Sequence, residues 1–152
     1  MKKIFLVFGL ILGLVITSVA QNLTEKDDLY YQNSKLYTGK YVTYYDNGNV
    51  KMDAYFKEGR KEGKVKIYFE DGQLNEIRSY KNNKMHGKWV KFNDHNIKIS
   101  IAHYKNGLKD GKWKIWNDYG NLIYTLQYKN GVKTGTWKSY NEKGDVINER
   151  EY

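Results

Sequence analysis

The sequence repeats every 24 residues, and this repeat limits the possible folds more than any other feature. The block YKNGLKDGKWKIW, at residues 104–116, has close counterparts at residues 56–68, 80–92 and 128–140. One glycine holds the same position in every unit, at Gly39, Gly63, Gly87, Gly111 and Gly135. A fixed period of this size indicates an array of identical supersecondary units that stack side by side.

The composition of each unit predicts two β-strands. Short segments rich in Tyr, Trp, Ile and Val are bounded by turn dipeptides such as Asn47-Gly48 and Asp71-Gly72. These dipeptides predict type I′ hairpin turns, in which both central residues have positive φ. A second turn glycine recurs at Gly48, Gly72, Gly120 and Gly144. Where the repeat loses a glycine, Asn83 and Asn96 replace it, and asparagine also tolerates the left-handed region.

The fold class predicted is therefore all-β. We expect an elongated single-sheet antiparallel meander of about five tandem 24-residue hairpins, which makes about ten strands. At roughly 4.8 Å between neighbouring strands, such a sheet would be about 48 Å long. A helical fold is excluded because glycine recurs too often and no apolar stripe with a 3.6-residue period runs between the glycines.

The first 20 residues have the layout of a signal peptide. A positive leader, Met1-Lys2-Lys3, precedes an apolar run that ends at Ile16, and small residues up to Ala20 form a cleavage site. The apolar run is shorter than the roughly 20 residues that span a bilayer, and the absence of cysteine excludes an acylated anchor. We expect an exported, soluble protein, periplasmic or secreted.

The rest of the chain divides into two parts. Residues 21–36 are a polar N-terminal segment or a partial capping repeat, and residues 37–152 are the repeat array. Exported small domains often rely on disulfides, but this chain has no cysteine, so packing and backbone pairing must stabilise it. It also has no proline, as expected of a chain made almost entirely of paired strands.

Aromatic residues form columns across the units. Two columns belong to the first segment of each unit: Tyr41, Val65, Trp89, Trp113 and Trp137, and Tyr44, Tyr68, Phe92, Trp116 and Tyr140. A third closes the second segment: Phe56, Tyr80, Tyr104, Tyr128 and Tyr152. Equivalent residues would lie about 9.6 Å apart, with intervening side chains between them. Trp113 and Trp116 are three residues apart, which requires either a bulge or aromatic residues on both faces.

The tandem pattern YxNGxxxGxWxxY resembles the MORN repeat, and more closely its longer bacterial variant. The resemblance covers residues 37–152 and departs from the pattern at Val65, Asn83, Asn96 and Lys98. It implies an elongated β-meander that serves as a binding or scaffold surface without enzymatic activity. Some bacterial proteins of this variant are grouped as antitoxins of toxin–antitoxin pairs, and eukaryotic arrays are associated with membranes, lipids and partner proteins.

No residue pattern predicts catalysis, a metal site or a cofactor. Acidic residues open the first turn of each unit, at Asp46, Glu70, Asp94, Asp118 and Glu142, but a spacing of about 9.6 Å is too wide to share a calcium ion. We expect the aspartates to bind their own turn backbone. His86, His95 and His103 occupy unrelated positions in the repeat.

Two residue types are candidates for binding. Lysines form the columns Lys40, Lys64, Lys88 and Lys112, and Lys57, Lys81, Lys105 and Lys129, with a shorter third column of Lys61, Lys109 and Lys133. They are either ordinary solvated side chains or a basic strip for anionic lipids, acidic glycans or an acidic protein. Trp89, Trp113 and Trp137 either pack the sheet or stack on sugars. Export disfavours nucleic acid as a partner.

The function predicted is that of a non-enzymatic, exported binding or scaffold module for a protein or a cell-envelope component. One alternative is an antitoxin-like protein that neutralises a partner toxin. Another is binding of an anionic lipid or glycan along the lysine and aromatic columns. The sequence predicts no oligomeric state.

Overall fold

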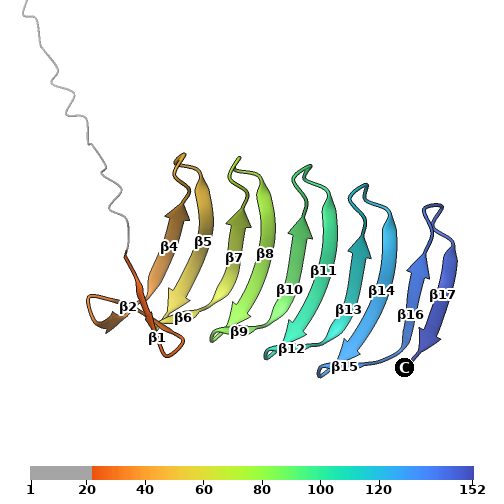
Figure 1. Ribbon diagram of the computed structural model, residues 1–152. Coiled ribbons are helices and arrows are strands. Elements are labelled where there is room, and N and C mark those ends of the chain that lie inside the picture. The colour runs from red at the N-terminus through yellow and green to blue at the C-terminus, as the bar shows by residue number, and fades with distance from the viewer. Residues whose placement is uncertain (1–21) are drawn as a thin grey trace, which may run out of the picture.

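The structure is a computed structural model that describes residues 22–152, and strands are the regular elements over this range (Figure 1). The signal peptide predicted for residues 1–20 lies outside the described residues. None of the residues 22–152 belongs to a helix long and apolar enough to cross a membrane.

Over residues 22–152, ten strands of the 14-stranded main sheet follow one another in chain order, each antiparallel to the next (Figure 1). The first strands of the five hairpins are β4 (Gly39–Tyr44), β7 (Gly63–Tyr68), β10 (Gly87–Phe92), β13 (Gly111–Trp116) and β16 (Thr136–Tyr140). Their partners are β5 (Val50–Lys57), β8 (Leu74–Lys81), β11 (Lys98–Lys105), β14 (Leu122–Lys129) and β17 (Val146–Glu151). The predicted single-sheet meander of tandem hairpins is confirmed.

Short strands and tight turns join one hairpin to the next. The short strands are β6 (Arg60–Lys61), β9 (Lys84–Met85), β12 (Leu108–Lys109) and β15 (Val132–Lys133), and each pairs with the end of the preceding long strand. In the turn before β12, Asn106 has φ of 51° and Gly107 has φ of 90°. Positive φ at both central residues is the requirement of a type I′ turn. Asn83 also has positive φ, 65°, as expected of a glycine substitute.

The turns inside the hairpins differ from the prediction. Gly48 has φ of 85°, but Asn47 is not among the residues with positive φ, so the type I′ turn predicted at Asn47-Gly48 is wrong. The N–H of Gly48 donates to the Tyr45 carbonyl at 2.9 Å, and the N–H of Tyr45 donates to the Asn49 carbonyl at 2.8 Å. These bonds close a three-residue loop in which a type I turn precedes a left-handed glycine. The type I′ turn predicted at Asp71-Gly72 is wrong for the same reason, because only Gly72 has positive φ.

A separate three-stranded sheet covers the N-terminal end of the array. It consists of β1 (Thr24–Lys26), β2 (Leu29–Gln32) and β3 (Lys35–Leu36). The ring of Tyr30 lies 4.5 Å from the ring of Phe56, centroid to centroid, and Phe56 is fully buried. Leu23 and Tyr30 pack against a core cluster that includes Phe56 and Val65. We call residues 22–36 the N-terminal cap.

The main sheet is a single layer in which neighbouring hairpins share few backbone pairs. Within the fourth hairpin, β13 and β14 pair from Gly111 to Trp116, whereas β11 and β13 pair only at Ser100 with Ile115 and at Ile101 with Lys114. Six hydrophobic residues are buried among the residues described: Tyr37, Ala54, Phe56, Val65, Ala102 and Tyr128. Most residues of the central strands are half-buried or exposed, so both faces of the sheet remain accessible to solvent.

Candidate functional site

The register of the hairpins assigns the candidate residues to the two faces of the sheet. Residues directly paired across antiparallel strands lie on the same face, and successive residues alternate. Trp113 pairs with Leu126, whereas Lys112 pairs with Gln127 on the opposite face. The same alternation holds in the other hairpins. We call the face that carries Trp113 the aromatic face and the face that carries Lys112 the lysine face.

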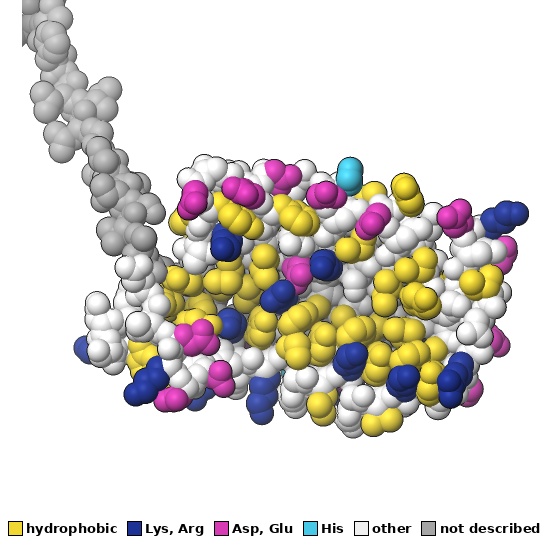
Figure 2. All heavy atoms as spheres, viewed as in Figure 1, with side chains coloured by type: hydrophobic (Ala, Val, Ile, Leu, Met, Phe, Trp, Pro, Cys, Tyr) yellow, Lys and Arg dark blue, Asp and Glu magenta, His cyan; other side chains and the backbone are white. Residues whose placement is uncertain are grey.

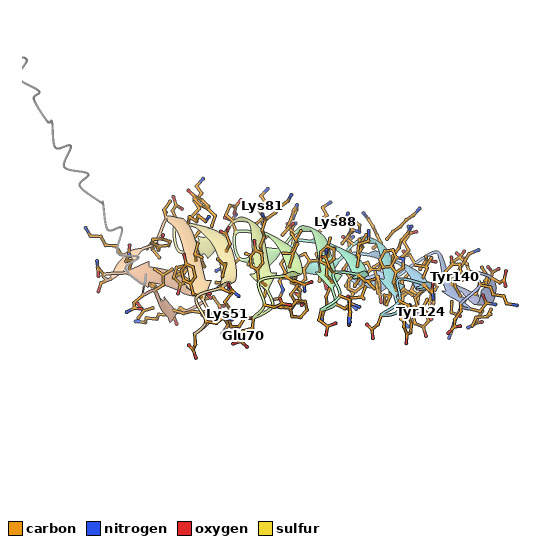
Figure 3. All side chains as sticks on the ribbon, turned by 90° about the horizontal axis from the view of Figure 1, so that it is seen from above. Lys51, Glu70, Lys81, Lys88, Tyr124 and Tyr140 are labelled. Carbon is orange, nitrogen blue, oxygen red and sulfur yellow. The ribbon has the colours of Figure 1, made fainter. Side chains whose placement is uncertain are left out.

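The candidate lysines and tryptophans therefore do not form one site. Trp89, Trp113 and Trp137 all lie on the aromatic face. The eight lysines of the two long columns lie on the lysine face: Lys40, Lys64, Lys88, Lys112, Lys57, Lys81, Lys105 and Lys129. Figure 3 shows Lys81 and Lys88 on one side of the sheet, with Lys51 and Tyr124 on the other.

Of the two explanations offered for the spacing of Trp113 and Trp116, aromatic residues on both faces is the one that applies. Residues 111–116 are continuous strand, so the two tryptophans point to opposite faces. A bulge is also present, but on the partner strand, because Ile115 pairs with Tyr124 and Trp116 pairs with Leu122, which leaves Ile123 unpaired. Aromatic side chains therefore occur on both faces.

On the aromatic face, two of the predicted columns interleave into one continuous ladder of rings. The rings of Tyr80, Trp89, Tyr104, Trp113, Tyr128, Trp137 and Tyr152 follow one another with centroids 4.7–5.6 Å apart. Figure 2 shows hydrophobic side chains as a band along this face, with basic side chains along its lower border. Tilted rings at this spacing stabilise a fold by more than the burial of their apolar area alone. We call these residues the aromatic ladder.

The tryptophans also close the gap between neighbouring hairpins. The indole Nε1–H of Trp113 donates to the carbonyl of His103 at 3.1 Å, and Trp89 and Trp137 donate in the same way to Ser79 and Gln127, each at 3.0 Å. Tryptophan thus replaces the backbone pairs that the diverging strands lack.

Residues 79, 103 and 127 occupy equivalent positions in the repeat, and each contacts the next part of the sheet in a way that the sequence analysis missed. On the lysine face, the Ser79 hydroxyl donates to the Lys88 carbonyl at 2.9 Å, and Nδ1 of His103 lies 2.6 Å from the Lys112 carbonyl. A carbonyl can only accept, so Nδ1 of His103 carries the proton. Residue type varies at this position, so the sequence shows no column there.

The third lysine column belongs to the aromatic face. Nζ of Lys109 lies 4.7 Å from the Trp113 ring centroid and 4.8 Å from that of Tyr128, and Lys133 sits in the same way over Trp137 and Tyr152. An ammonium over an aromatic face is attracted to its π-electrons. These lysines therefore help to hold the ladder together.

Burial favours the neutral form of one phenol in the ladder, Tyr104, and of one in the N-terminal cap, Tyr30. Burial raises the pKa of Tyr104, and burial together with the nearby Glu25 carboxylate raises the pKa of Tyr30 well above its usual range. Desolvation penalises the charged phenolate, so these side chains remain protonated over the physiological pH range.

On the lysine face, ion pairs lie mainly in the first and last hairpins, and most lysines of the central hairpins are unpaired. Lys40 pairs with Asp53 at 3.3 Å in the first hairpin, and Lys138 pairs with Glu149 at 3.0 Å in the last. Lys129 pairs with Asp110 at 3.3 Å, and the Asn130 N–H, together with Lys129, lowers the pKa of that carboxyl. Among residues 22–152, no ion pair within 4.0 Å involves Lys57, Lys64, Lys81, Lys88, Lys105 or Lys112.

The acidic column does not bind the turn backbone as predicted. In the fourth hairpin the amide Oδ1 of Asn117 accepts from Tyr119 and Asn121, and Asp118 is exposed. In the last three hairpins the residue that does so is the asparagine one position earlier, which reaches the N–H groups that follow it. In the first two hairpins it is Asn47 or Asp71, one position later, which accept from Asn49 and Gln73. Within residues 22–152, no three His, Asp or Glu side chains are grouped closely enough to hold a metal ion.

The comparisons with known proteins concern the repeat and the fold. The family model described as "MORN repeat variant" matches residues 37–58, 61–82, 109–130 and 133–152. No curated protein matches the chain. Among solved structures, the Glycosylation Associate Protein complex from Streptococcus agalactiae matches 84% of this chain at 20% identity with a TM-score of 0.39, and the match spans 23% of that chain.

Proposed function

This chain belongs to the MORN repeat variant family, and from that premise we propose that it is a non-enzymatic binding or scaffold module for a protein or cell-envelope component. The single observation that carries the proposal is the one-layer sheet, which leaves two long faces of different chemistry exposed. Repeat arrays commonly use such extended surfaces for binding.

The unit that the family model leaves unmatched, between residues 82 and 109, still has the geometry of its neighbours. Its strands β10 and β11 pair with the same register as β13 and β14. Asn96 takes a positive φ of 58° in place of glycine, and Lys98 lies over the ring of Trp116. The binding surface therefore extends through this unit without interruption.

The proposed absence of catalysis has support from the surroundings of the titratable groups. His86 contacts Asn106, His95 contacts Asp94 in an exposed turn, and His103 contacts the backbone of Lys112. All three lie in or beside the hairpin of β10 and β11, but each contacts a different group and none contacts another histidine, so the three do not form one acid–base site.

We place the protein outside the cytoplasm, where the signal peptide predicted at residues 1–20 would direct it. An antitoxin-like role would require a partner toxin that meets the protein in that compartment. The scaffold function is favoured here because it needs only an envelope component.

The proposal is tested by purifying the full chain, carrying a C-terminal tag, from envelope extracts of its own cell. One envelope component should be retained reproducibly and should bind the isolated protein again after separation. Recovery of the chain alone under mild extraction, with no component that rebinds, would contradict the proposal. A partner with toxin activity that the chain suppresses would support the antitoxin alternative instead.

A further inference from the structure

One row of side chains on the lysine face alternates between cations and hydrogen-bonding groups along the array. Lys64 pairs with Ser79, Lys88 with His103, and Lys112 with Gln127, across three successive hairpins. Neighbouring strands are about 4.8 Å apart, so the ammonium groups recur about every 9.6 Å. We call residues 64, 79, 88, 103, 112 and 127 the cationic row.

The cationic row carries charge that the protein itself does not neutralise. Lys64, Lys88 and Lys112 are exposed, and no ion pair within residues 22–152 involves them. In the first hairpin the equivalent Lys40 is paired with Asp53, and in the last hairpin Thr136 replaces lysine. The positive field is therefore concentrated over the three central hairpins, where it complements a linear anion.

The groups between the lysines retain hydrogen-bonding capacity toward solvent. The Ser79 hydroxyl and Nδ1 of His103 both donate to backbone carbonyls, which leaves the Ser79 oxygen and Nε2 of His103 free to accept. The side-chain amide of Gln127 makes no hydrogen bond within residues 22–152, whereas the backbone carbonyl of Gln127 accepts from Trp137. These groups can bond to hydroxyl and amide groups on a ligand. A surface that recognised charge alone would not require them.

The row opens into a groove at its C-terminal end. The groove has a volume of about 310 Å³ and is lined on the lysine face by Lys112, Lys114, Thr125, Gln127 and Thr136. The Thr125 hydroxyl bonds to the Tyr140 hydroxyl and the Thr136 hydroxyl donates to the Glu151 carboxylate, but both oxygens can still accept. Two ammonium groups and one amide beside them suit an anion that also carries hydroxyl groups.

The aromatic face is a weaker candidate for sugars. Trp113 has the ring of Tyr104 on one side and that of Tyr128 on the other, with Lys109 also over its ring. The tryptophan faces are therefore already occupied by protein groups. Stacking of a sugar would have to displace one of these contacts.

We propose that the cationic row binds a linear acidic polysaccharide in which an acidic sugar alternates with a neutral one. Each acidic group lies at a lysine, and the neutral sugar meets Ser79, His103 or Gln127 between two lysines. This inference rests on the proposed binding function and names the chemical class of its envelope ligand.

The first test measures affinity for hyaluronate oligosaccharides by calorimetry at low salt. The full chain is compared with the variant Lys64→Gln, Lys88→Gln, Lys112→Gln and with a charge-matched control, Lys35→Gln, Lys51→Gln, Lys143→Gln. The control sites are exposed: Lys51 lies on the other side of the sheet from Lys88 (Figure 3), Lys35 in β3 of the N-terminal cap, and Lys143 in the last hairpin turn. Exposed ion pairs of about 0.5 kcal/mol each predict a loss of roughly tenfold in the first variant. The control should bind like the parent, and equal losses in both variants would overturn the proposal.

The second test separates sugar recognition from charge alone. Gln127→Ala removes the amide without changing charge, so it should weaken binding of hyaluronate and leave binding of poly-L-glutamate unchanged. Poly-L-glutamate or phosphatidylglycerol vesicles that bind more tightly than hyaluronate would overturn the proposal. If no polysaccharide binds but an envelope component still rebinds the protein, this inference alone fails and the binding function stands.

Discussion

At the scale of single residues, the backbone of this protein depends on positions that only glycine and asparagine hold without strain. The junction turns need positive φ at two successive residues, such as Asn106 and Gly107. The left-handed region costs other residues roughly 1–2 kcal/mol. The environment of each glycine then decides whether a side chain adds a steric cost to this conformational one.

Gly59 and Gly107 separate these two costs. A Cβ on Gly107 would meet no atom within 4 Å, whereas a Cβ on Gly59 would lie 2.7 Å from Cδ2 of Leu36 and 3.0 Å from the Tyr30 carbonyl oxygen. We predict that Gly107→Ala lowers the free energy of unfolding by about 1 kcal/mol and that Gly59→Ala lowers it clearly more. Urea denaturation measures both, and equal losses would contradict the contact between Gly59 and the N-terminal cap.

Tyr30 makes the stability depend on alkaline pH. Its phenol has a raised pKa in the folded protein because it is buried, whereas the unfolded phenol ionises near pH 10. Its stabilising contribution is therefore complete below pH 10 and is lost as the pH rises above that value. We predict that the free energy of unfolding falls more between pH 9 and pH 11 in the parent than in Tyr30→Phe, which has no phenol at this position. Parallel curves would contradict this.

At the scale of elements, the hairpins are held together by side chains more than by backbone pairs. Two pairs join β11 to β13, so the ladder rings and the tryptophan Nε1–H bonds supply the remaining cohesion. The N-terminal cap does the same at its end of the array. Lys61 lies 4.7 Å from the Tyr30 ring, the distance that separates Lys109 from Trp113. The second repeat has Val65 where later repeats have tryptophan, and the ring of Tyr30 takes the place of the missing indole.

Trp113 tests the cohesion between hairpins. We predict that Trp113→Phe, which keeps a ring but loses the bond to His103, costs about 1 kcal/mol. Trp113→Ala should cost about 3 kcal/mol because it also opens the ladder. Chemical denaturation gives both values, with Tyr119→Ala at an exposed turn as the neutral control. A Trp113→Ala variant as stable as its parent would show that the ladder does not join the hairpins.

The exchange between Tyr30 and Val65 is tested by a double-mutant cycle. Val65 is 2% exposed, so Val65→Trp overpacks the site and should cost about 1–3 kcal/mol. With Tyr30→Ala the new indole can occupy the vacated space, so the double variant should be more stable than the sum of the single effects. Additive effects would contradict the claim that the Tyr30 ring occupies the space of the missing tryptophan.

Elements were predictable from sequence to the extent that they repeat. The strands and their order follow from five equivalent glycines and regular aromatic columns. The cap did not follow, because Tyr30 and Asp28 meet Phe56 and Asn83 through contacts between distant parts of the chain. The departures at Val65 and Asn83 look irregular in the repeat, but both residues lie where the cap docks. The type I′ turns lie between the hairpins and not inside them, and the sequence does not distinguish the two places because Asn-Gly dipeptides occur at both.

At the scale of the whole molecule, the array presents two long faces with different chemistry. The aromatic face holds the sheet together, and the lysine face carries unpaired charge over the three central hairpins. The sequence identified both sets of residues but could not separate them. Their separation depends on the register of each strand, where a shift of one residue would exchange the faces.

The most direct test of the account is photo-crosslinking of the full chain in its own cell envelope. A photoreactive phenylalanine is placed at Gln127 on the lysine face or at Tyr124 on the aromatic face, two exposed positions on β14. The account predicts a crosslinked adduct from position 127 and little or none from position 124. Adducts that arise mainly from position 124, or from neither position, would contradict a lysine face that binds an envelope component.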